Sequence, residues 1–265
     1  MGTMLLRWIK RIGVGLTLLA AIVALPVTWP EPLFAYTISV GHLTVASDQP
    51  IPEAQGRSLL RAVAERLDAS PLNAKQPHMH IYIANTRWRR HWLWIPVLGQ
   101  PVGGYVTLPL SRNHAFLSGA DFDTGELIAP SGFRPPQPRD LVYYSAHELT
   151  HVMTGEQVGD IASHFVKAWV REGLADYVAL PRQSAQSLFD AIGTRDADLP
   201  MMHTHGVYAP YRLVVTWLLE DEGWSIDELL TTDLDFEVVR TQMAAALTEG
   251  QPSAETTAVM GSSQP

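Results

Sequence analysis

An uncharged apolar run near the N-terminus constrains the topology of the chain more than any other feature. It covers residues 12–29 and follows three basic residues, Arg7, Lys10 and Arg11. Its length approaches the ~20 residues that a helix needs to cross a bilayer, and it exceeds the ~7–15 residues of a usual signal-peptide core. We therefore predict an uncleaved transmembrane anchor at residues 12–29, and the alternative is a signal peptide that is removed.

The basic residues predict how this segment is oriented. Lys and Arg next to a membrane helix stay preferentially on the cytoplasmic side. Residues 1–11 are therefore expected to be cytoplasmic, and the chain after Glu31 is expected to be extracytoplasmic, either periplasmic or extracellular. The sequence has no second uncharged apolar run of that length. We expect a single-pass protein that contacts the lipid bilayer through its N-terminal helix.

Charge and cysteine content exclude several classes of function. The chain has 19 Lys and Arg against 27 Asp and Glu, a net charge of −8. Nucleic-acid-binding proteins usually carry a basic balance and a basic patch, so no nucleic-acid partner is predicted. The chain also has no cysteine. Thiolate metal ligands and cysteine nucleophiles are thereby excluded, and any metal must be bound by His, Asp or Glu.

The pattern after the anchor changes from strand-like to helical. Strands are predicted at residues 36–47 (a pair or one bent strand), 78–85, 103–110 and 114–118. Apolar residues at helical spacing predict an amphipathic helix within residues 52–70. From residue 138 onward the pattern is helical.

We therefore predict an α+β fold with one domain at residues 36–247. Its strand-rich part covers residues 36–130 and its mainly helical part covers residues 138–247. The tail at residues 248–265 lacks a hydrophobic pattern and is predicted to be disordered.

Residues 86–96, TRWRRHWLWIP, combine three tryptophans with three arginines. Such a basic aromatic cluster can lie at a membrane interface or bind an anionic partner. A half-buried segment that leads from a strand into a loop is the other interpretation. The sequence alone leaves both open.

The segment YYSAHELTHVMTGE, residues 143–156, contains two histidines four residues apart. In a helix this spacing places His147 and His151 on one face, where both can reach one ion at the ~2.0–2.1 Å of a Zn–N bond. Glu148 is too close in sequence to ligate comfortably with them, but it can act as a general base. Two surface histidines on a helix are the alternative.

A third ligand is available in residues 167–180, KAWVREGLADYVAL, which predict a further helix. Glu172 can complete the ligand set if the chain turns back between the two helices. Asp176 follows one turn later and can accept the N–H of a ligating histidine. Two His and one Glu leave a coordination position for water, which is typical of catalytic zinc sites. We predict one Zn²⁺ per chain.

HELTH followed by WVREGLADY resembles the gluzincin zinc metallopeptidases, and specifically the peptidase-MA-like family. Residues 207–230 are similar to the next helix of that family, so the resemblance covers about residues 140–247. It implies a zincin-like fold in which His147, His151 and Glu172 bind zinc. It also implies that Glu148 is the base and proton shuttle.

The resemblance implies two further parts of a peptidase site. Tyr208 falls at the family's tyrosine and would donate its hydroxyl to the oxyanion. Pro210 places that tyrosine at a helix start, however, so Tyr211 or a nearby histidine (His203 or His205) stays a second candidate. A strand beside the cleft would pair with an extended substrate, and residues 103–110 and 114–118 are the candidates.

The sequence thus predicts a membrane-anchored extracytoplasmic zinc metallopeptidase that hydrolyses a peptide or protein substrate. Two alternatives stay open. One is a catalytically silent peptide-binding module on a peptidase scaffold. The other is a zinc hydrolase that acts on a non-peptide bond, because the metal chemistry is the same.

Overall fold

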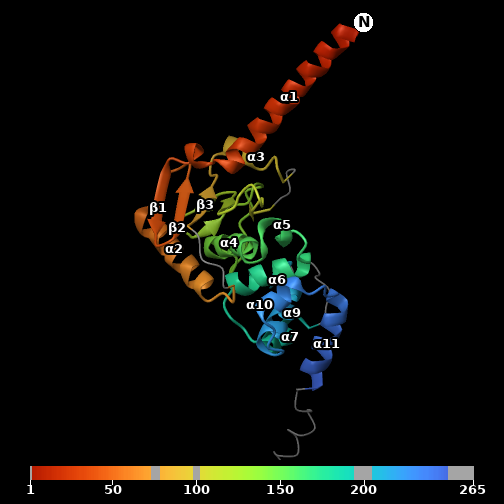
Figure 1. Ribbon diagram of the computed structural model, residues 1–265. Coiled ribbons are helices and arrows are strands. Elements are labelled where there is room, and N and C mark those ends of the chain that lie inside the picture. Colours follow the sequence, from red (N-terminus) through yellow and green to blue (C-terminus); the bar gives the residue numbers. More distant parts are fainter. Residues whose placement is uncertain (1, 73–77, 98–101, 194–204, 250–265) are drawn as a thin grey trace, which may run out of the picture. The chain divides into compact units, whose positions relative to one another are not determined.

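The computed structural model describes residues 2–72, 78–97, 102–193 and 205–249. It is a mixed α and β structure, with a five-stranded sheet followed by a series of helices (Figure 1). The predicted α+β class is confirmed. Of the tail predicted to be disordered, residues 248 and 249 end the last helix, and residues 250–265 lie outside the described residues.

The N-terminal helix α1, Gly2–Thr28, contains a stretch from Lys10 to Thr28 that is long and apolar enough to span a membrane. Its last turn belongs to the core of the domain that follows. Val27 is only 1% exposed, and its carbonyl accepts a hydrogen bond of 2.8 Å from Nε2 of His114. The helix therefore ends inside the domain rather than at a flexible linker.

The burial of His114 makes the stability of the protein dependent on pH. The pKa of His114 is lowered from 6.5 to about 4, chiefly because the imidazole is buried. The Val27 carbonyl and Glu31 raise this pKa, and nearby His80 lowers it, but burial has the largest effect. The unfolded chain takes up this proton below pH 6.5, whereas the folded chain does so only near pH 4. Stability from the neutral imidazole is therefore complete above pH 6.5 and is lost as the pH falls to 4.

We expect this loss to reach about 3 kcal/mol in the free energy of unfolding, since each pKa unit corresponds to about 1.4 kcal/mol. Chemical denaturation of the detergent-solubilised chain between pH 7 and pH 4 measures it. His114→Gln can still donate to Val27 but does not titrate in this range. A variant whose pH dependence equals that of the wild type would contradict the assignment.

The main sheet has the strand order β1-β2-β3-β5-β4. Strands β1, Tyr36–Val40, and β2, Leu43–Ser47, form an antiparallel hairpin, so a strand pair rather than one bent strand occupies residues 36–47. Gly41 turns between them at a φ of 57°, where glycine has no steric penalty. Helix α2, Glu53–Asp68, then leads to β3, Met79–Ile83, which lies parallel to β2.

The far side of the sheet is built from β5 and β4. Strand β5, His114–Leu117, lies parallel to β3, and β4, Gly104–Tyr105, pairs antiparallel with β5 at the edge. The strand predicted at residues 103–110 is therefore much shorter than expected. Pro109 explains part of the error, because proline has no N–H to donate to a sheet. A two-stranded sheet follows, β6, Ala120–Asp121, with β7, Glu126–Leu127.

Residues 86–96 form a helix, α3, Arg87–Leu93, so the strand-to-loop interpretation of this segment is wrong. A distant carboxylate fixes the start of the helix. Asp48 accepts hydrogen bonds from the backbone N–H groups of Asn85, at 2.8 Å, and Thr86, at 2.9 Å. The sequence around residues 86–96 does not predict this contact, because Asp48 lies 37 residues before Asn85.

The chain divides into two compact units. The first comprises residues 1–164 and 178–180, and it includes the sheets together with α4, Leu141–Val158, and α5, Asp160–Ser163. Helices α2 and α4 contact each other and the main sheet. The single domain predicted at residues 36–247, with a strand-rich part at residues 36–130 and a helical part at residues 138–247, stays a prediction.

The second unit comprises residues 165–177 and 181–265. Its described helices are α6, Ala168–Ala179 (whose last two residues belong to the first unit), α7, Ala185–Ile192, α9, Ala209–Glu220, α10, Ile226–Thr231, and α11, Phe236–Glu249. Gly173 of α6 lies directly against the backbone of α9. A Cβ atom at this position would be 2.6 Å from the carbonyl oxygen of Tyr211. Glycine therefore permits the close approach of these two helices.

Candidate metal centre

Helix α4 carries the two histidines of the HELTH motif in its middle. The helix begins at Asp140, whose side chain accepts the backbone N–H of Tyr143 at 2.9 Å, a usual N-terminal cap. Most of its length is buried, including His147, Glu148 and Leu149. The motif thus lies on a largely buried helix rather than on a surface helix.

The two histidines project side by side from α4, as their spacing predicts. Their ring centroids are 5.0 Å apart, and the rings are nearly perpendicular, at 89°. His147 is only 5% exposed, whereas His151 is partly exposed. The rings are therefore not two surface histidines with unrelated orientations.

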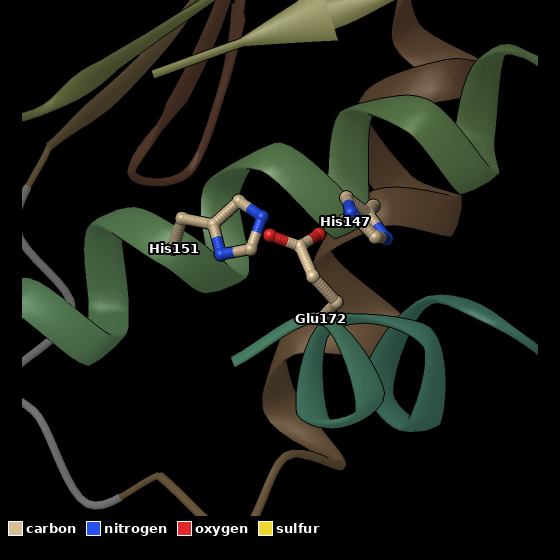
Figure 2. A group of neighbouring side chains, drawn as sticks. All are labelled: His147, His151 and Glu172. Atoms are coloured by element: carbon tan, nitrogen blue, oxygen red, sulfur yellow. The ribbon is translucent and has the colours of Figure 1, made fainter. Parts of the chain in front are cut away.

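Glu172 of α6 completes the group. One ligand atom from each of His147, His151 and Glu172 lies within 4.8 Å of the other two. Figure 2 shows the Glu172 carboxylate directed toward the space between the two imidazole rings. The structure thus brings together all three ligands predicted from the sequence, and within the described ranges no other trio of His, Cys, Asp or Glu side chains meets the same criterion.

The donor set fits a metal ion such as zinc. Two imidazole nitrogens and one carboxylate oxygen are the ligands of many catalytic zinc sites. Three ligand atoms placed tetrahedrally at ~2.0–2.1 Å from one ion lie about 3.4 Å apart. The ligand atoms of this group lie within 4.8 Å of one another, so binding requires them to close by up to about 1.4 Å through side-chain rotation. The His-His-Glu group could hold a metal ion.

A neighbouring arginine contacts the third ligand. Arg171 donates from Nε to Oε1 of Glu172 at 3.4 Å, and the Glu172 side chain is 16% exposed. Arg171 thus pairs with the same carboxylate that would ligate a metal.

Glu148 lies beside the edge strand β4. The Glu148 residue is 7% exposed, and a Cβ atom at Gly104 would lie 2.8 Å from its Cγ and 2.9 Å from its Oε1. The absence of a side chain at Gly104 therefore leaves the room that the carboxylate occupies. Of the two strands proposed to pair with substrate, β5 is interior and β4 has β5 as its single strand neighbour among the described residues.

We expect Gly104→Ala to displace the Glu148 carboxylate while leaving the three ligands in place. A displacement of ~1 Å at a reacting group can lower the rate by about 100-fold. The measurements are kcat on a cleaved peptide and metal content, with Leu110→Ala as a control at a half-exposed position of the same segment. An unchanged kcat would show that Glu148 tolerates the methyl group.

The other predicted site residues occupy the expected elements. Asp176 lies in α6 one turn after Glu172, and it is 1% exposed. Tyr208 immediately precedes α9, with Pro210 in the first turn, as predicted, and its side chain makes no capping hydrogen bond. The rings of Tyr208 and Tyr211 stack at 6.2 Å. The roles of Tyr208, Tyr211 and Asp176 stay predictions, and His203 lies outside the described residues.

Sequence reasoning missed the part that Gly104 plays. The pair Gly103-Gly104 at the start of a predicted strand was the available clue, because glycine in a strand often marks the close approach of another group. Which group approaches depends on the placement of α4 beside β4, and the sequence does not contain that information in any local pattern.

Comparison with models of known protein families gives no match, and comparison with curated proteins gives no significant match.

Proposed function

We propose that the protein is a membrane-anchored zinc metallopeptidase whose catalytic domain is extracytoplasmic. The observation that carries the proposal is the convergence of His147, His151 and Glu172, with ligand atoms within 4.8 Å of one another. The resemblance of HELTH and WVREGLADY to the peptidase-MA-like gluzincins agrees with it. A three-ligand site leaves one position for water, which is the arrangement of a catalytic centre.

The residues around the ligands supply the remaining chemistry. A bound zinc ion would lower the pKa of a water molecule toward ~7 and polarise a carbonyl group. Glu148 accepts the proton of the attacking water and later donates it to the leaving amine. Tyr208 donates its hydroxyl to the oxyanion that develops on the carbonyl. Asp176 fixes the orientation of a ligating histidine.

Edge strand β4 favours a peptide substrate. A strand with one free edge can pair with an extended peptide, whose backbone then supplies most of the hydrogen bonds. Gly104 places this strand against Glu148, so a peptide that pairs with β4 is carried past the proposed base. A small non-peptide substrate would gain nothing from such an edge.

The proposed location follows from α1. The stretch from Lys10 to Thr28 can cross a membrane, and Arg7, Lys10 and Arg11 near its start favour a cytoplasmic N-terminus. The metal centre would then lie outside the cytoplasm.

Metal analysis and a peptide-library digest of the detergent-purified full chain test the proposal. We expect one zinc per chain, cleavage of peptides, and loss of cleavage on chelation with recovery on added zinc. Stoichiometric zinc without turnover would identify a silent binding module. Hydrolysis of esters or other non-peptide bonds alone would identify a different zinc hydrolase. The absence of stoichiometric metal would refute the proposal.

A further inference from the structure

Helix α3 and the end of α1 share one hydrophobic core. Val27 of α1 is 1% exposed, Leu93 of α3 is 1% exposed, and Trp94 is 4% exposed, and all three belong to the same cluster of buried side chains. The two helices also contact each other directly, as Figure 1 shows at the base of α1. Helix α3 is therefore held at the point where α1 enters the domain.

The opposite side of α3 presents aromatic and aliphatic side chains to the exterior. Trp88 is 55% exposed and Ile95, just after the helix, is 47% exposed. The ring of Trp92 stacks on that of Trp88 at 6.1 Å. Several large apolar groups on so short a segment are unusual for a surface that faces only water.

The charge on this surface is positive. Residues 86–96 contain three arginines and no acidic residue, although the whole chain has a net charge of −8. Arg90 is used internally, because it donates to the carbonyls of Ala84 and Asn85. Arg87 is exposed, and the guanidinium of Arg89 lies 4.6 Å from the Trp88 ring centroid. Tryptophan beside arginine is typical of the boundary between lipid and water.

The carboxylate that pairs with an arginine of this cluster does not cancel the charge of Arg87. Asp48 lies 3.5 Å from Arg89, but its side chain is 0% exposed and also accepts two backbone N–H groups. Arg87 is therefore the charge presented outward, together with the aromatic pair. An anionic, partly apolar surface is the complementary partner.

We propose that α3 is a second membrane contact, which lies on the headgroup region of an anionic bilayer beside the exit of α1. The position argues for lipid rather than for a protein partner. The exposed apolar surface of α1, including Leu18, Ile22 and Leu25, needs a bilayer to cover it, and α3 is fixed at the end of that surface. Trp88, Trp92 and Ile95 enter the interface, and Arg87 meets lipid phosphates. The proposal does not depend on the metal centre.

Site-directed spin labelling tests this contact, because the chain contains no cysteine and one introduced thiol carries the only label. The full chain is reconstituted into nanodiscs that contain a phosphatidylglycerol fraction, and collisions of the label with oxygen and with a water-soluble nickel chelate are measured. Ile95→Cys is the test position, since it leaves the Trp88–Trp92 pair intact. Leu18→Cys, 59% exposed on α1, reports insertion of the anchor.

Ile161→Cys is the matched control for a label in water. Ile161 is an apolar residue of α5 in the same unit, 69% exposed, and Figure 1 shows α5 apart from the base of α1. We expect the label at residue 95 to collide several-fold more with oxygen, relative to nickel chelate, than the label at residue 161. Arg87→Gln added to Ile95→Cys should lessen this difference, as should nanodiscs of neutral lipid.

Equal nickel accessibility at residues 95 and 161, while the Leu18 label reports lipid, would overturn the proposal. A label at residue 18 that reports water would also overturn it, because α3 would then have no bilayer beside it. Protection at residue 95 that appears only when other membrane proteins are added would assign this surface to a protein partner. Because no hydrolysis is measured, these results are independent of the proposed peptidase activity.

Discussion

Glu148→Gln is expected to abolish peptide hydrolysis while the protein keeps its metal. Glutamine has nearly the same shape as glutamate, so the room beside Gly104 stays filled, but the amide cannot accept the proton of the attacking water. Removal of a general base typically lowers the rate by about 100- to 10,000-fold. The loss should appear in kcat, since the base acts in the chemical step rather than in substrate binding.

Elemental analysis and kcat measurements on the same preparation decide this result. Glu156→Gln is the matched control, because Glu156 lies on α4 but is exposed. We expect it to retain wild-type activity. If Glu148→Gln retained its kcat, the base would have to be another group. If it lost both metal and activity, Glu148 would have to be counted among the ligands.

Glu172→Ala is expected to remove the metal and, with it, the activity. Partners that only support a ligand typically contribute 10- to 100-fold to metal affinity, so a direct ligand should contribute at least about 100-fold. The metal-dependent part of the protein's thermal stability should disappear as well, because a ligand that binds only the folded state raises its stability. Competition titration with a chelating indicator measures the affinity.

Glu222→Ala controls for the loss of a carboxylate from the same unit, since Glu222 is exposed beyond the end of α9. It should bind metal as the wild type does. If Glu172→Ala bound zinc as tightly as the wild type does, Glu172 would not be the third protein ligand. His147→Ala and His151→Ala should behave as Glu172→Ala does.

The two histidines could be predicted as a pair because their spacing depends on helical geometry alone. A spacing of four residues places His147 and His151 on one face in any α-helix, and α4 is regular through both. Glu172 was found by its place in a second helical segment, and α6 forms there. The convergence itself was an inference about tertiary structure, which the ligand-atom separations support.

Features that depend on contacts between distant segments could not be predicted. Helix α3 starts where Asp48, 37 residues before Asn85, accepts backbone N–H groups. Strand β4 pairs with β5 over two residues, Gly104 and Tyr105. Its place beside Glu148 depends on how α4 contacts the sheet. Local propensity contains neither contact, so the sequence did not predict the helix of the first segment and predicted too long a strand for the second.

The burial of Val27 limits how far the first unit could move from a bilayer. Because α1 ends within the core and is bonded to His114, an α1 that spans a bilayer, as proposed above, would leave no pliable stalk between that bilayer and the first unit. In a membrane, β4 and Glu148 would therefore be held at a fixed distance from the lipid surface. A substrate of the proposed peptidase would have to place its scissile bond at that same distance. A soluble protein could do so with an unfolded segment. A membrane protein could do so with an extramembrane segment that reaches equally far from the lipid.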